Sequence, residues 1–170
     1  LKLSALGMGC MRLPQGDAYA DINVPEVKRM VALAMEKGVN YYDTAWGYHD
    51  GNSERVMGEV LSAYPRENFY LATKFPGYDL SNLGKVKEIF EEQLERCRVD
   101  YFDFYLFHNV CEMNIEQYLD PKYGIFEYLM EQKKNGRIRH LGFSCHGNLP
   151  VLKRFLEAYG SHMEFCQLQI

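Results

Sequence analysis

The stretch VNYYDTA at residues 39–45 is an apolar run that carries Asp43 near its end and leads into the loop residues WGY. Three later stretches share this design, with a polar side chain near the end of an apolar run: FYLATKF at 69–75, FDFYLFH at 102–108 and IRHLGFSC at 138–145. Continuous apolar runs of this length are typical of parallel strands that are buried on both faces. We expect two further strands, at residues 3–11 and 165–170.

The sequence between these runs predicts helices. From the second run onward the strands begin at residues 39, 69, 102, 138 and 165, so successive starts lie 27 to 36 residues apart, the length of one strand and one helix. Apolar residues at helical spacing, with Pro near a start and Gly or Pro after an end, locate the helices. We expect helices at about 25–37, 53–64 with Ser53 as N-cap, 81–97 with Ser81 or Asn82 as N-cap, 115–135 with a break near Pro121 and Gly124, and 149–159.

Alternating strands and helices are compatible with a doubly wound sheet or with a (β/α)8 TIM barrel. The polar residues favour the barrel, because side chains from many strand ends converge on its active site. Five residues stand at or near the ends of five different strands: Asp43, Lys74, His108, Ser144 and Gln167. A doubly wound sheet more often has a glycine-rich phosphate turn after its first strand, and GMGCMR at residues 7–12 lacks the third glycine of that motif.

The fold class predicted here is therefore α/β, a (β/α)8 TIM barrel of which only strands 1 to 6 and the intervening helices are present. Barrels of this kind need roughly 200 residues or more, and the chain has 170. We expect residues 1–170 to form an incomplete barrel whose remainder, beyond residue 170, is absent. Because an unclosed barrel leaves apolar strand edges uncovered, we expect this piece alone to be aggregation-prone and inactive.

Composition argues against several classes of partner. The net charge is −4, and no basic run with interleaved aromatic residues points to nucleic acid. No run of about 18 apolar residues points to a membrane span. The five cysteines are odd in number, and no two of them form a Cys-x-x-Cys pair, which argues against a disulfide framework or a metal site. We expect reduced cysteines, a cytoplasmic location and a small-molecule partner, with no prediction of the oligomeric state.

The motifs at the strand ends resemble those of the aldo-keto reductase superfamily. The resemblance covers essentially the whole chain in the order of the family, and it rests on these segments: Tyr42-Asp43-Thr44-Ala45 with Tyr48 and Ser53-Glu54, Ala72-Thr73-Lys74, Leu106-Phe107-His108, and KNGRIR at 134–139 before Gly142-Phe143-Ser144. It implies an enzyme that transfers hydride from NADPH to an aldehyde or ketone, with a catalytic tetrad of Asp43, Tyr48, Lys74 and His108. NADH remains open as the cofactor.

The chemistry of the tetrad agrees with this implication. Carbonyl reduction needs a proton at oxygen, and the Tyr48 phenol could donate it. An unperturbed tyrosine has a pKa of about 10, and a nearby ammonium such as that of Lys74 lowers such a pKa. Asp43 could hold Lys74 charged and oriented, and His108 could orient the carbonyl and stabilise charge on its oxygen.

The resemblance also implies cofactor and substrate contacts. A Ser-Asn pair and a Gln bind the nicotinamide carboxamide in the family, which carries over as Ser144 and Gln167, with Gln169 as the alternative to Gln167. Cys145 stands where the Asn is usual. Further contacts to the cofactor are expected from Gly9, Cys10, Met11 and Asp43, whereas Trp46 and His108 are expected to line the substrate pocket. Trp46 is equally compatible with a packing role, and some relatives carry an iron–sulfur cluster in a C-terminal region that this chain does not contain.

Two alternative functions remain open at this point. One is a regulatory subunit that binds nucleotide and docks on a partner, because such subunits can retain the tetrad. The other is a lyase that forms a Schiff base with Lys74. His49, next to Tyr48, could shape the pocket, but the expectation we keep is a solvated loop histidine.

Overall fold

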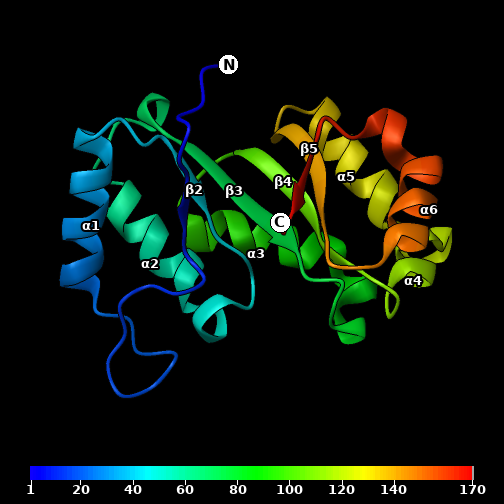
Figure 1. Cartoon of the computed structure of the whole chain (residues 1–170), viewed down its shortest axis with the longest axis horizontal. Helices are drawn as coiled ribbons and strands as arrows, with labels where there is room; N and C mark the ends of the chain where they lie inside the picture. The colour runs from blue at the N-terminus through cyan, green and yellow to red at the C-terminus, as the bar shows by residue number, and fades with distance from the viewer. Residues whose placement is uncertain (170) are drawn as a thin grey trace. The chain divides into compact units, whose positions relative to one another are not determined.

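The computed structural model describes residues 1–169, and it consists of two compact units that are described separately below (Figure 1). The first unit contains residues 1–73 and 93–100, and the second contains residues 74–92 and those from 101 onward. The six strands are β1 Met8–Gly9, β2 Tyr41–Asp43, β3 Tyr70–Phe75, β4 Phe102–Val110, β5 Ile138–Cys145 and β6 Phe165–Leu168. The α-helices are α1 Val24–Glu36, α2 Asn52–Leu61, α3 Val86–Cys97, α4 Ile115–Leu119, α5 Ile125–Lys134 and α6 Leu149–Tyr159.

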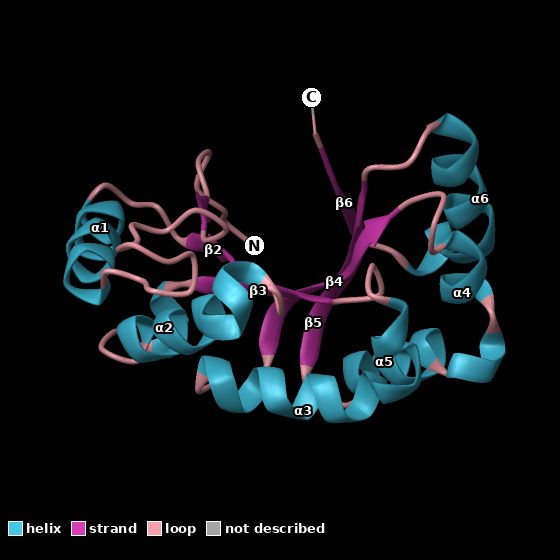
Figure 2. Ribbon diagram, turned by 90° about the horizontal axis from the view of Figure 1, so that it is seen from below, coloured by secondary structure: helices cyan, strands magenta, loops and turns pink. Residues whose placement is uncertain are grey.

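In the first unit the strands are parallel and follow the chain, in the order β1-β2-β3. Gly9 pairs with Asp43, and Asp43 pairs with Ala72, so β1 and β2 end at one level and β3 continues three residues further, to Phe75. Helices α1 and α2 lie side by side (Figures 1 and 2). Helix α1 buries Val27 and Val31 at helical spacing, and this apolar face holds it in the unit.

In the second unit β4, β5 and β6 are also parallel and in chain order. Figure 2 shows α4 and α6 next to each other, beside the strands of this unit. An aromatic cluster fills the space between them, with ring pairs in edge-on and stacked contact, and its members are Phe107, Tyr118, Phe143, Phe155 and Tyr159.

Short 3-10 turns complete the connections. They are η1 Tyr48–Gly51, η2 Arg66–Asn68, η3 Leu80–Lys85, η4 Pro121–Tyr123 and η5 Gly160–His162. The predicted break in the stretch 115–135 is confirmed, because α4 ends at Leu119, η4 follows, and α5 begins after Gly124, which has a positive φ of 61°. No helix within residues 1–169 is long and apolar enough to cross a membrane.

Several predicted boundaries differ from the structure. Strand β1 is much shorter than the predicted 3–11, and β4 continues two residues beyond His108. The prediction that Ser53 caps α2 is wrong, because the N-cap is Gly51, and Ser53 lies inside the helix with its hydroxyl bonded to other elements. Asp79 caps η3, which precedes α3, so the Ser81 or Asn82 cap is also wrong. The last residue of the predicted final strand, Ile170, lies outside the described residues.

Candidate active site

Asp43 is the last residue of β2 and is 8% exposed. Backbone hydrogen bonds on either side hold this strand end, because Cys10 N donates to Asp43 O at 2.8 Å and Thr44 N donates to Ala72 O at 2.9 Å. The Thr44 hydroxyl lies 2.8 Å from the Ser53 hydroxyl, which donates to the carbonyl oxygen of Cys10 at 2.9 Å. The chain at Asp43 is thus fixed by three segments that are distant in sequence.

Tyr48 follows five residues later, as the first residue of η1, and it is half-buried. Its neighbour His49 is fully buried, so the expectation of a solvated histidine is wrong. Leu13 N donates to His49 Nε2 at 3.0 Å, and His49 Nδ1 lies 2.6 Å from the carbonyl oxygen of Tyr19. Both ring nitrogens of His49 thus have a backbone partner. His49 also has a φ of 52°, which is rare for a non-glycine residue and persists only where the surroundings enforce it.

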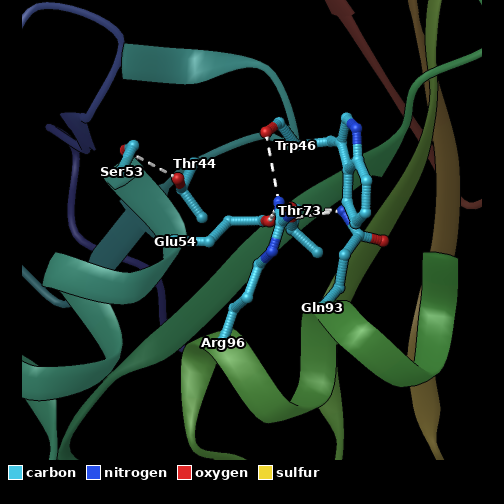
Figure 3. Close-up of polar contacts among 7 residues, drawn as sticks. All are labelled: Thr44, Trp46, Ser53, Glu54, Thr73, Gln93 and Arg96. Atoms are coloured by element: carbon cyan, nitrogen blue, oxygen red, sulfur yellow. Dashed lines mark hydrogen bonds and ion pairs between the residues drawn. The ribbon is translucent and has the colours of Figure 1, made fainter. Parts of the chain in front are cut away.

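A buried polar network connects α2, β3 and α3 and reaches the carbonyl oxygen of Trp46 (Figure 3). Glu54 is fully buried in α2, and its Oε1 accepts hydrogen bonds from Thr73 Oγ1 at 2.6 Å and Gln93 Nε2 at 2.7 Å. Arg96 donates to the other oxygen of Glu54 at 3.2 Å, and its guanidinium lies 3.7 Å from the centre of the Trp46 ring. Burial raises the pKa of Glu54, and the hydrogen bonds and the charge of Arg96 oppose this shift.

Trp46 is half-buried, and the Arg96 guanidinium covers one face of its indole. From the sequence, Trp46 was equally compatible with a wall of the substrate pocket and with a packing role. The structure assigns it a packing contact on one face, and the pocket role stays a prediction.

In the second unit, Lys74 is the penultimate residue of β3 and only 1% exposed. Burying an ammonium without partners is costly, so a lysine at this position depends on polar or charged groups around it. His108 lies on β4 and is half-buried. Burial, followed by the Lys74 charge and His146, lowers the pKa of His108 to about 3. His108 is therefore a neutral imidazole at any pH near neutrality.

His108 stands in a β-bulge, which explains why β4 extends past it. Phe107 pairs with Phe143 of β5, and the next pair is Val110 with Cys145, so β4 has one residue more than its partner between these pairs. Asn109 takes up the extra length with a φ of 56°. Bulges of this kind redirect side chains and are frequent next to active sites.

Side chains bond the backbone of the bulge. Asn109 N donates to Ser144 Oγ at 2.8 Å, and Asn114 Nδ2 donates to the carbonyl oxygen of Asn109 at 2.9 Å. Asn114 is fully buried and also accepts from Cys111 N at 2.9 Å. Ser144, predicted only as a cofactor ligand, thus has a second task in holding the strand end.

The residues expected to contact a nicotinamide in the second unit are Ser144, Cys145 and Gln167. Ser144 and Gln167 are direct partners in the β5–β6 register, so their side chains share one face of the sheet. Gln169 lies just beyond the end of β6, and the choice between the two glutamines stays a prediction. The Ser144 hydroxyl keeps its own proton to donate, because it only accepts from Asn109. Cys145 is nearly buried, with Sγ 3.9 Å from the carbonyl oxygen of Gly147, so it replaces the usual Asn by a weak donor.

The first loop offers fewer side-chain contacts. Cys10 is fully buried, so its thiol faces the interior of the first unit, whereas Gly9 and Met11 are exposed. A cofactor at this loop would meet backbone and the Met11 side chain. Within residues 1–169 there is no group of three or more His, Cys, Asp or Glu side chains that could hold a metal ion.

Sequence reasoning missed the contacts made by His49, Glu54, Arg96 and Asn114. Glu54 has no clear local signal, because its neighbours in the sequence, Ser53 and Arg55, are polar and a surface position would be expected. His49 and Arg96 act through contacts between segments far apart in the chain, which no local pattern reveals. The contacts of Asn114 are local, but they depend on the bulge in β4.

Comparison with known proteins identifies the family of the chain. Residues 5–169 match the model of the Aldo/keto reductase family. The NADH-specific methylglyoxal reductase of Escherichia coli is 28% identical over 160 residues, which cover 84% of this chain and 48% of the relative. A holo-form aldo-keto reductase from Bacillus halodurans has a TM-score of 0.78 at 28% identity, over 100% of this chain and 54% of that chain.

An aldo-keto reductase of Klebsiella pneumoniae in complex with NADPH shares the fold, with a TM-score of 0.76 at 22% identity over 99% of this chain and 55% of that chain. The chain spans about half the length of the curated relatives it matches. The fold is that of strands 1 to 6 of a (β/α)8 barrel. Given the family match across nearly all of its length, this chain belongs to the aldo/keto reductase family.

Proposed function

We propose that the protein is an oxidoreductase that reduces an aldehyde or ketone with a nicotinamide cofactor, using Asp43, Tyr48, Lys74 and His108. The observation that carries the proposal is the pairing of a buried lysine, Lys74, with a neutral histidine, His108, near the ends of two strands. Membership of the family supports the reaction class.

Each residue has a task that follows from its chemistry. The cofactor supplies the hydride when it is bound. Tyr48 transfers its phenolic proton to the carbonyl oxygen, and Lys74 favours the phenolate that remains. Asp43 keeps Lys74 charged and oriented. The neutral ring of His108 carries one proton and donates it in a hydrogen bond to the carbonyl oxygen, which orients the substrate.

NADPH is the cofactor we propose. Both forms occur among similar proteins, because the Klebsiella structure contains NADPH and the Escherichia coli relative is NADH-specific. A titration of the full-length protein with each nucleotide, followed by nicotinamide fluorescence, distinguishes them. The substrate we propose is a small carbonyl compound, and the cytoplasmic location stays a prediction.

The first prediction concerns Tyr48. Tyr48→Phe removes the proton donor and keeps the ring, so we expect kcat with a panel of aldehydes and ketones to fall by about 100-fold or more. The dissociation constant of NADPH should change little. Turnover is measured in the full-length protein by the loss of nicotinamide absorbance. Tyr128→Phe is the matched control, because the Tyr128 hydroxyl bonds the surface carboxylate of Glu91.

Retention of wild-type kcat by Tyr48→Phe would rule out Tyr48 as the general acid. Tight NADPH binding without turnover of any carbonyl would favour the regulatory subunit. Covalent trapping of substrate on Lys74 by borohydride would favour the Schiff-base lyase.

A further inference from the structure

Tyr118, in α4, is among the largest fully buried side chains of the described chain, and neither the resemblance nor the proposed reaction gives it a task. Its hydroxyl lies 2.7 Å from the carbonyl oxygen of His108 and 3.2 Å from that of Phe75, the residue after Lys74. Gly77 N donates to the same hydroxyl oxygen at 3.1 Å. One phenol therefore reaches the two strands that carry Lys74 and His108 and the loop that follows the first of them.

The bonding capacity of the hydroxyl matches these contacts. A tyrosine hydroxyl donates one proton and accepts from donors. The shorter contact makes the His108 carbonyl its main acceptor, and the Gly77 amide uses the oxygen as its own acceptor. Burial raises the pKa of Tyr118, so the proton that makes the bond to His108 stays in place at any working pH.

The surroundings leave the ring little freedom. It contacts the rings of Phe75 and Phe107 edge-on, at centroid distances of 6.4 and 5.4 Å. A Cβ atom at Gly77 would overlap the Tyr118 ring at its hydroxyl end, so the close approach depends on glycine at this position. A ring held so tightly positions its hydroxyl accurately.

We propose that Tyr118 is a positioning residue of the active site, whose hydroxyl fixes the strand ends that carry Lys74 and His108. The proposal rests on the proposed function, in which these two side chains act on the carbonyl. The bulge at His108 and Asn109 breaks the regular ladder of β4 and β5. A strand end without its regular ladder needs other bonds to keep a fixed geometry, and Tyr118 supplies one from the helix side.

The test is Tyr118→Phe in the full-length protein, with Tyr159→Phe as the matched control. Tyr159 belongs to the same aromatic cluster and donates from its hydroxyl to the carbonyl oxygen of Tyr118 at 3.3 Å, but it bonds neither strand end. We expect Tyr118→Phe to lower kcat by about 10- to 100-fold, as small displacements of catalytic groups do, with little change in NADPH affinity. Tyr159→Phe should keep the wild-type kcat.

Two measurements by NMR are independent of turnover. The Gly77 amide loses its acceptor in Tyr118→Phe, so its hydrogen exchange should accelerate by at least tenfold relative to the control. The titration midpoint of the His108 ring, which faces Lys74, His146 and the edge of Tyr78, should rise, because a looser strand end admits water. In Gly77→Ala the added Cβ atom displaces the Tyr118 hydroxyl. We therefore expect faster exchange of the amide at residue 77 and a higher titration midpoint of His108, as in Tyr118→Phe.

The outcomes separate the two proposals. If wild-type protein reduces no carbonyl but Tyr118→Phe alters Gly77 exchange and His108 titration, the proposed function fails and the positioning of the strand ends is supported. If wild-type protein turns over and Tyr118→Phe matches Tyr159→Phe in kcat, exchange and titration, the role of Tyr118 is overturned. Failure of Tyr118→Phe to fold leaves Gly77→Ala as the deciding variant.

Discussion

The protonation of His108 is linked to folding, because burial and the Lys74 charge give it a pKa of about 3 in the folded protein against an ordinary value of 6.5. Between these two values the unfolded chain binds a proton at His108 that the folded chain does not bind. The free energy of unfolding therefore falls as the pH decreases from about 6.5 toward 3, by up to about 1.4 kcal/mol per unit. Above pH 6.5 His108 is neutral in both the folded and the unfolded chain, so this loss of stability does not occur.

His108→Gln should remove this part of the pH dependence. We expect the slope of unfolding free energy against pH, measured by urea denaturation between pH 4 and 6.5, to be shallower in His108→Gln than in wild type. His162→Gln, at an exposed position, is the matched control and should keep the wild-type slope. An unchanged slope in His108→Gln would mean that the pKa of His108 in the folded protein is close to its ordinary value, contrary to the prediction.

Single residues differ in how well the sequence predicts them. Asp43, Lys74 and His108 are predictable, because a polar side chain near the end of an apolar run stands out against its neighbours. The burial of His49 is not predictable, because its partners Leu13 and Tyr19 come from a loop about 30 residues earlier and bond it through backbone groups. Its neighbours in sequence are polar or small, which is typical of a surface loop.

At the scale of elements, the ion pair of Glu54 and Arg96 connects α2 with the end of α3. Glu54 is fully buried, so removing Arg96 leaves a carboxylate without its cation. Breaking a buried pair in this way costs about 3–5 kcal/mol. We expect Arg96→Met to lose about this much in the free energy of unfolding, measured by urea denaturation at pH 8.

The matched control is Arg154→Met, which breaks the exposed pair of Arg154 and Glu116 and should cost less than about 1 kcal/mol. The deficit of Arg96→Met should be smaller at pH 5 than at pH 8. Without Arg96 the pKa of Glu54 rises further in the folded state, so protonation at the lower pH offsets the loss. Equal costs for the two arginine variants would show that the Glu54–Arg96 pair does not stabilise the fold.

Helices and strands were largely predictable from periodicity and from Pro and Gly positions, and α6 has the predicted bounds, Leu149–Tyr159. The predicted cap at Ser53 failed because its hydroxyl bonds Thr44 and Cys10 rather than its own helix. The run FDFYLFHNV has no glycine, and its one weak signal for the bulge in β4 is Asn109, since asparagine tolerates a positive φ better than most residues. The bulge also depends on Ser144 in β5 and on Asn114, the N-cap of α4.

For the molecule as a whole, each unit has an apolar pocket with exposed side chains. One pocket, in the first unit, includes Leu6, Met30 and Leu33, which are 73%, 37% and 56% exposed. Another, in the second unit, includes Leu156 and Leu168, which are 44% and 47% exposed. Contiguous apolar patches on a protein that is alone in solution promote association.

We therefore expect residues 1–170, expressed alone, to associate in a concentration-dependent way and to bind a hydrophobic dye, as measured by light scattering after size exclusion and by dye fluorescence. The double variant Leu33→Gln/Leu156→Gln should reduce both signals, because it makes each pocket more polar. Leu80→Gln is the matched control, since Leu80 is 50% exposed but lines neither pocket. A chain that stays monomeric across the dilution series, without dye binding, would show that these pockets are tolerated in water. In that case the apolar surface that the exposed leucines offer would be too small to drive association.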